Sequence, residues 1–177
     1  MAKNRIMLAR FPLLLITVSA TFSDAFALPT SERSVSRNEV SFGAGAFGVF
    51  DSKQSTIFKL GYAYRDPERL GGFSPILQGM IGEDSLYYLA LGAEYQYQIN
   101  SNWSVGVSVS GGYLHSGSSS LGHHLGHDLQ FYSTLSATYY MTEESALRLE
   151  YGHISNSGFG DRNPGSESLI ASYIFRF

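Results

Sequence analysis

From residue 39 onward the chain alternates apolar and polar residues with a period of two, in segments separated by short turns. Successive side chains of a β-strand point to opposite faces, so this alternation predicts strands with one apolar and one polar face. The clearest segment spans residues 87–98, where Tyr, Leu and Ala alternate with Gly, Glu and Gln. Helical periodicity is hard to find, and the chain is therefore expected to be all-β.

Eight alternating segments are expected, most of them about ten residues long, which is the length of a tilted strand that crosses a bilayer. They are placed at residues 39–46, 56–65, 73–82, 87–98, 103–110, 129–139, 147–156 and 166–177. The third is the least regular, because Pro75 interrupts it and its apolar face is unassigned. Residues 115–126, rich in Ser, Gly and His, form the longest predicted loop.

The first 27 residues have the pattern of a secretory signal peptide. Lys3 and Arg5 precede a short apolar run at residues 11–18, and Ala25-Phe-Ala27 resembles a cleavage site. The apolar run is too short to span a bilayer as a helix. We therefore expect residues 1–27 to be removed, and residues 28–177 to form one domain that begins with a polar lead-in at 28–37.

Composition narrows the class of protein further. The chain has no cysteine, which excludes disulfides and thiolate metal sites. Its net charge of −3 gives no basic excess for binding nucleic acid. With 12 Tyr, 12 Phe and 19 Gly on an alternating, exported chain, the composition is typical of an outer-membrane barrel.

Aromatic residues near the ends of the apolar faces favour a membrane barrel, because such residues form girdles at both interfaces. They are Tyr62, Tyr64, Tyr87, Tyr95, Tyr97, Trp103 and Tyr139. The polar faces carry charges that can pair inside a narrow interior, Lys59, Arg65 and Arg148 with Glu39, Glu94 and Glu150. The predicted fold is an eight-stranded antiparallel up-and-down transmembrane β-barrel, too narrow for a porin channel. A soluble secreted sandwich or lipocalin-like barrel is the alternative.

Candidate catalytic residues lie near the C-terminus. With a period of two, His153 and Ser155 continue the apolar face of the segment that starts at Leu147, close enough for an imidazole to meet a hydroxyl. Glu167 shares its face with the apolar residues of the last segment. If these two segments pair as a hairpin, a Ser-His-Glu set forms on an apolar exterior, which suggests a lipid substrate.

The run His153-Ile-Ser155-Asn156-Ser-Gly158, followed by Asn163-Pro-Gly and Glu167, resembles the lipid A 3-O-deacylase family, PagL. The resemblance implies an outer-membrane serine esterase that hydrolyses the acyl ester at the 3-position of lipid A. It assigns Ser155 as nucleophile, His153 as general base and Glu167 as the residue that orients the imidazole. It also implies oxyanion or site support from Asn156, Gly158 and Asn163, with no cofactor and no metal.

Asn156 has the opposite parity from Ser155, so its side chain reaches an oxyanion only if the strand ends or twists there. Otherwise its backbone N–H is the better donor. With an even number of strands, both termini are expected on the periplasmic side, and the site would then face the outer leaflet. The expected substrate in that leaflet is lipopolysaccharide, and outer-membrane lipid is expected to surround the barrel. A homodimer is compatible with this arrangement.

Three alternatives remain open from the residues. The same triad fits an acyltransferase or phospholipase barrel, and a His beside a Ser on a strand also occurs in non-catalytic structural or adhesin barrels of the OmpX type. The histidines at 115, 123, 124 and 127 could suggest a metal site. Contact with phosphates or water is the favoured interpretation of this loop, because no acidic residues are interspersed within the His cluster.

Overall fold

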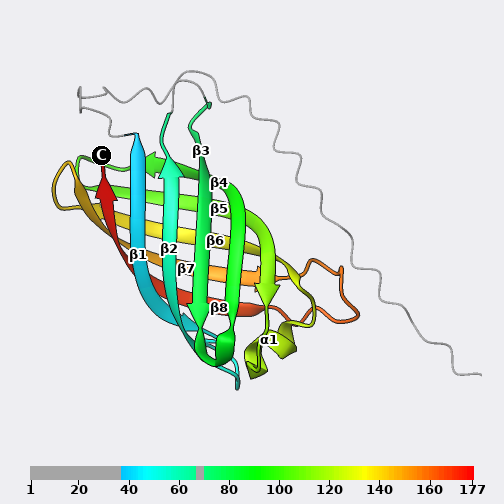
Figure 1. Cartoon of the computed structure of the whole chain (residues 1–177). Coiled ribbons are helices and arrows are strands. Elements are labelled where there is room, and N and C mark those ends of the chain that lie inside the picture. The colour runs from blue at the N-terminus through cyan, green and yellow to red at the C-terminus, as the bar shows by residue number, and fades with distance from the viewer. Residues whose placement is uncertain (1–36, 67–69) are drawn as a thin grey trace, which may run out of the picture. The chain divides into compact units, whose positions relative to one another are not determined.

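The computed structural model describes residues 37–66 and 70–177, which fold into eight strands and two short helices (Figure 1). The signal peptide predicted at residues 1–27 lies outside the described residues, as does nearly all of the predicted lead-in. The elements are β1 (Asn38–Phe47), β2 (Ser55–Tyr64), β3 (Phe73–Gly82), the 3₁₀ helix η1 (Glu83–Ser85), β4 (Tyr87–Gln98), β5 (Trp103–His115), α1 (Ser120–Leu125), β6 (Leu129–Tyr140), β7 (Ser145–Ser155) and β8 (Ser166–Arg176).

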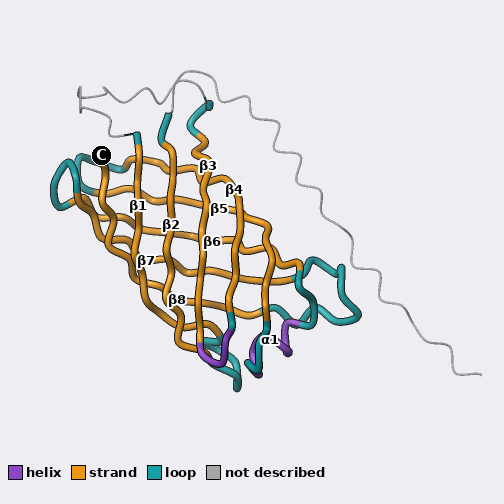
Figure 2. The backbone as a smooth tube through the Cα atoms, viewed as in Figure 1, coloured by secondary structure: helices purple, strands orange, loops and turns teal. Residues whose placement is uncertain are grey.

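Each strand pairs with the next in antiparallel register, and β1 pairs with β8, so the sheet closes on itself (Figure 2). The amide of Asn38 donates to the carbonyl of Phe177 at 3.1 Å, which brings the start of β1 and the end of β8 to one end of the barrel. Figure 1 places α1 at the opposite end, together with the β1–β2, β3–β4 and β7–β8 connections. We call this end the loop end. The predicted closed all-β barrel is confirmed.

The predicted alternation is confirmed along the strands, because the apolar faces point outward and are exposed. In β2 the outward Phe58 and Leu60 are 59% and 54% exposed, while the inward Lys59 is buried. The face of β3 is now assigned, with Ser74 and Gln78 buried inside and the residues of Pro75's parity outside. Two details differ from expectation: β5 continues to His115, and the loop that follows contains the helix α1.

The half of the interior away from the loop end is lined by ion pairs, as predicted from the charged inward residues, and a cavity of about 30 Å³ remains beside them. Lys59 pairs with Glu150 at 2.5 Å, and Arg65 and Arg148 each pair with Glu39 and Glu94 at 2.5–3.4 Å. These side chains are at most 9% exposed. Removing one partner would leave a buried charge unpaired. The cluster links residues of four strands, β1, β2, β4 and β7, and Arg65 directly follows the end of β2.

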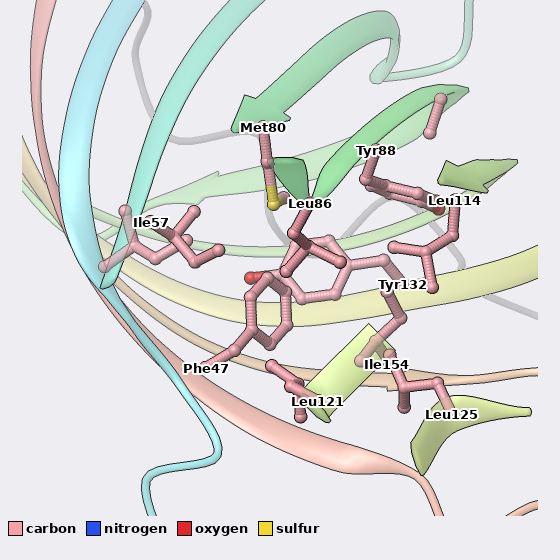
Figure 3. Close-up of a cluster of buried hydrophobic side chains, with 12 residues drawn as sticks. Phe47, Ile57, Met80, Leu86, Tyr88, Leu114, Leu121, Leu125, Tyr132 and Ile154 are labelled. Atoms are coloured by element: carbon pink, nitrogen blue, oxygen red, sulfur yellow. The ribbon is translucent and has the colours of Figure 1, made fainter. Parts of the chain in front are cut away.

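An apolar cluster fills the half of the interior toward the loop end (Figure 3). It draws side chains from most of the strands, and Leu121 and Leu125 of α1 close it at the loop end, both about 2% exposed or less. The space left between these side chains is about 10 Å³, room for at most one water. No acyl chain fits inside this end of the barrel, so a lipid-handling site has to lie on the outer face.

Within the described ranges, no helix is both long and apolar enough to cross a membrane.

Gly152 of β7 has a packing role that a substitution can test. A methyl group there would lie 2.5 Å from ring carbons of Tyr132, whose buried hydroxyl is hydrogen-bonded to Ser168 at 2.7 Å. We expect Gly152→Ala to destabilise the folded barrel by about 1–3 kcal/mol, because the ring must move in a filled interior. Urea titration of the refolded protein, read as the heat-modifiable band on gels, measures this. Gly79→Ala is the matched control, because a methyl group there meets its nearest atoms at 3.9 Å; equal losses in the two variants would contradict the interpretation.

Candidate active site

His153 and Glu167 face each other across the β7–β8 pair on the outside of the barrel. They are direct register partners, and the imidazole Nδ1 lies 3.2 Å from Glu167 Oε1. Their side chains are 49% and 28% exposed. If Nδ1 carries the proton and donates it to the carboxylate, Nε2 is left as an acceptor, which is the form a general base needs. The predicted hairpin contact between these two residues is confirmed.

Ser155 lies two residues beyond His153 on the same face of β7 and ends that strand. It is half-buried, and among the described residues its hydroxyl makes no hydrogen bond to His153. A nucleophile–base hydrogen bond is often absent before substrate binds and forms in the complex. The structure therefore places Ser155 two residues from His153 on the same outward face, and a hydrogen bond between the two side chains would form only in the complex.

Gly165 packs directly against the imidazole from the β7–β8 connection. Its φ is +68°, and a methyl group there would lie 2.6 Å from His153 Cε1 and 3.0 Å from Nε2. A side chain at this position would push the ring away, and the left-handed backbone also favours glycine. The sequence analysis included Gly165 in the family motif but assigned it no role, and nothing in its composition predicts the contact with the imidazole.

The surface beside Ser155 is aromatic. Phe131 of β6 is the register partner of Ser155, and its ring lies 6.0 Å from that of Phe159 in the β7–β8 connection. Phe159 is 64% exposed. A hydroxyl bordered by two apolar rings on an outward face suits an acyl ester more than a water-soluble polar substrate.

The three predicted support residues form one hydrogen-bonded network. Asn156 is fully buried; its amide donates to the carbonyls of Leu125 at 3.1 Å and Arg162 at 2.7 Å. Its Oδ1 accepts from the Gly158 amide, and its own backbone amide donates to Asn163 Oδ1, both at 2.9 Å. The network fastens the β7–β8 connection to α1. Because these donors are all engaged, the oxyanion role of Asn156 and Gly158 stays a prediction.

The four histidines of the predicted loop do not converge. His115 stacks on Tyr87 with ring centroids 4.6 Å apart, and His127 Nδ1 accepts from the Leu129 amide at 2.9 Å. The other two lie in α1. In the described part of the chain, no three or more His, Cys, Asp or Glu side chains gather where they could hold a metal ion.

The fold and the site together define a class, a closed eight-stranded barrel with Ser, His and Glu side by side on its outer face. Solved structures share the fold. A de novo designed transmembrane β-barrel matches with a TM-score of 0.59 and 15% identity over 80% of this chain and 96% of its own. The outer membrane enzyme PagL matches at 0.56 and 16% over 78% and 99%, and the Neisserial surface protein A at 0.53 and 15% over 79% and 96%.

The family is shown by the sequence. The profile of the family Lipid A 3-O-deacylase (PagL) matches residues 56–176, a span that includes every candidate site residue. The chain belongs to this family. No curated protein matches the chain in sequence.

Asn156→Ala tests whether the hydrogen-bonded network holds the β7–β8 connection. The substitution removes the amide that donates to the carbonyls of Leu125 and Arg162 and the oxygen that accepts from Gly158. We therefore expect the connection to open more easily by about 1–3 kcal/mol. Tryptic cleavage after Arg162 in the folded protein should then accelerate about tenfold or more. Asn102→Ala is the control, because it removes an amide that donates to a carbonyl at the opposite end of the barrel. Unchanged cleavage in Asn156→Ala would show that the network is dispensable.

Proposed function

We propose that this protein is an outer-membrane serine esterase that removes the 3-position acyl chain of lipid A, with Ser155 as nucleophile. Support comes from the contact between His153 and Glu167 beside Ser155 on the outward face, in a chain of the lipid A 3-O-deacylase family. The filled interior adds to it, because a lipid reaches these residues from the surrounding membrane and not through the barrel.

The first step transfers the acyl group to the enzyme. Ser155 Oγ attacks the carbonyl carbon of the ester while its proton passes to His153 Nε2, and Glu167 stabilises the resulting imidazolium. The tetrahedral intermediate collapses by breaking the bond to the sugar oxygen, which takes the proton from His153. Lipid A leaves with a free 3-hydroxyl, and the acyl chain stays on Ser155.

The second step releases the fatty acid. Water gives a proton to His153 and attacks the acyl-enzyme, and the bond to Ser155 Oγ breaks as Oγ recovers that proton. The product is a 3-hydroxy fatty acid. In our proposal water reaches His153 and Glu167 from the loop end, where β7 ends and β8 begins. In our proposal Asn156 and Gly158 stabilise the oxyanion, which requires their present hydrogen bonds to loosen when substrate binds, and Asn163 supports the connection.

The place of the site along the barrel axis fits the substrate. Ser155 ends β7 and Glu167 lies at the start of β8, so the site is at the loop end. In the proposed orientation both chain termini are periplasmic, the loop end is extracellular, and the site lies at the depth of the outer leaflet. Lipid A occupies that leaflet, so substrate is supplied by diffusion in the membrane plane.

Mass spectrometry of lipid A from cells that express the protein tests the proposal. We expect wild type to remove one 3-hydroxyacyl group from the 3-position, and Ser155→Ala to lose activity by about 10³-fold or more. Ser133→Ala is a demanding control, because Ser133 is an exposed serine that is the β6 register partner of His153. Its activity should remain near that of wild type.

Other outcomes would overturn the assignment in different ways. Gain of an acyl chain would identify an acyltransferase, and release of fatty acid from phospholipid alone would identify a phospholipase. Unchanged lipid A both in cells and with detergent-purified folded protein would leave a non-catalytic barrel. Loss of activity in Ser133→Ala but not in Ser155→Ala would assign the other serine as nucleophile.

Glu167→Gln should slow the chemical step while leaving substrate binding unaltered. The amide can still accept from Nδ1 but no longer stabilises the imidazolium by charge. A hydrogen bond to a charged group contributes about 1.5–3 kcal/mol, so we expect kcat to fall about 10- to 100-fold. Steady-state deacylation kinetics in detergent measure this. A loss confined to KM would contradict the assigned role.

A further inference from the structure

The β1–β2 connection, residues 48–54, is hydrogen-bonded to the first residues of β8. It lies on the β1 side of β8, whereas His153 lies on the β7 side. The amides of Gly48 and Val49 donate to the carbonyl of Glu167 at 2.7 and 3.3 Å. One residue earlier, Ser166 Oγ donates to Asp51 Oδ2 at 2.9 Å. The family resemblance assigns no role to these contacts, and they fall on the residues that carry the catalytic carboxylate.

The hydrogen bond to Asp51 fixes the position of Ser166, because it is the hydrogen bond of that buried hydroxyl. Ser166 is fully buried and faces the barrel interior, whereas Asp51 is half-buried in the β1–β2 connection at the loop end. A buried hydroxyl requires a partner, and a carboxylate is a stronger acceptor than a neutral oxygen. Without Asp51 the start of β8 would have to shift or admit water to satisfy Ser166.

Ser166 lies between the two residues that contact the imidazole. Gly165 before it packs on Cε1 and Nε2, and Glu167 after it lies at hydrogen-bonding distance from Nδ1. A shift of Ser166 is therefore transmitted to both sides of the His153 ring. Gly165 and Glu167 are the contacts that can hold the ring in place, since the β6 register partner of His153 is the small, exposed Ser133.

We propose that Asp51 is a positioning residue for the active site, acting through Ser166 to hold Gly165 and Glu167 against His153. Asp51 touches neither the substrate nor the reacting atoms in this scheme. The inference rests on the proposed esterase function and adds the β1–β2 connection to the parts of the chain that set its rate.

The test combines single and double substitutions in purified folded protein, with activity normalised to the heat-modifiable folded band. Asp51→Ala and Ser166→Ala should each lower kcat for lipid A deacylation about 10- to 100-fold, because a misplacement of about 1 Å costs up to 10²-fold. KM should change less than about twofold. The double variant should lose no more than either single one, because both substitutions break the same link.

Two further variants separate positioning from general damage. Asp51→Asn keeps an oxygen acceptor for Ser166 and should retain kcat within about threefold of wild type. Asp128→Ala removes an exposed carboxylate at the same end of the barrel and should have no effect. The rate at which a fluorophosphonate probe labels Ser155 should follow the same order, which reports on the activated serine without lipid A.

The inference fails if both alanine variants keep wild-type kcat, if their losses multiply in the double variant, or if Asp128→Ala is equally slow. Failure of the proposed function looks different. In that case wild-type protein would neither deacylate lipid A nor label at Ser155, whatever residue stands at position 51, and both proposals would be overturned together.

Discussion

Closure of the hydrogen-bonded sheet is the constraint on which the rest of this structure depends. In hydrocarbon every backbone amide and carbonyl needs a partner within the protein, and a barrel meets this need only when the first and last strands pair. Here β1 and β8 pair over nine residues of register, from Glu39 to Phe47. Closure also sets the tilt and register of every other strand, so each outward side chain has fixed neighbours.

The candidate site follows from that register. His153 and Glu167 are 14 residues apart in the chain, yet they are direct partners because β7 and β8 pair without a bulge between them. A shift of one residue in either strand would turn one of the two into the interior. Ser155 needs no register at all, since it shares a strand with His153. The sheet thus serves as a rigid support for the proposed catalytic residues, and their exposure on the outer face would give a membrane lipid access.

The filled interior makes this outer site possible in a narrow barrel. The ion pairs of Lys59, Arg65 and Arg148 leave no buried charge unpaired among these side chains, and the apolar cluster leaves about 10 Å³ empty. Gly152 shows how closely the two faces are linked. It lies between two outward residues, Tyr151 and His153, and lacks a side chain because the Tyr132 ring occupies the interior behind it. Interior packing therefore directly supports the backbone of β7, the strand that carries His153 and Ser155.

Period-two alternation predicts the strands, the faces of all but β3, and the interior ion pairs. It does so because one face of each strand meets lipid and the other the interior, so apolar and polar residues alternate along the chain. It also predicted that Glu167 and His153 share a face. The parity of β3 was not predictable, since Pro75 and three glycines (Gly72, Gly79 and Gly82) blur the alternation there. The helix α1 was missed because six residues with two histidines and a glycine carry almost no helical signal.

The sequence could not predict the contacts made by the connections between strands. Those contacts depend on which strands become neighbours when the barrel closes, and the alternation of apolar and polar residues carries no information about this. Asp51 and Ser166 are 115 residues apart and become neighbours only because β1 lies next to β8. Asn156 joins Leu125 for a similar reason, across the β6–β7 pair. Both contacts tie a connection to the few residues around His153. The barrel wall fixes where His153 and Glu167 lie, and the connections at the loop end make contacts with the residues around them. Under the proposed function, substitutions in these connections are therefore expected to change the rate.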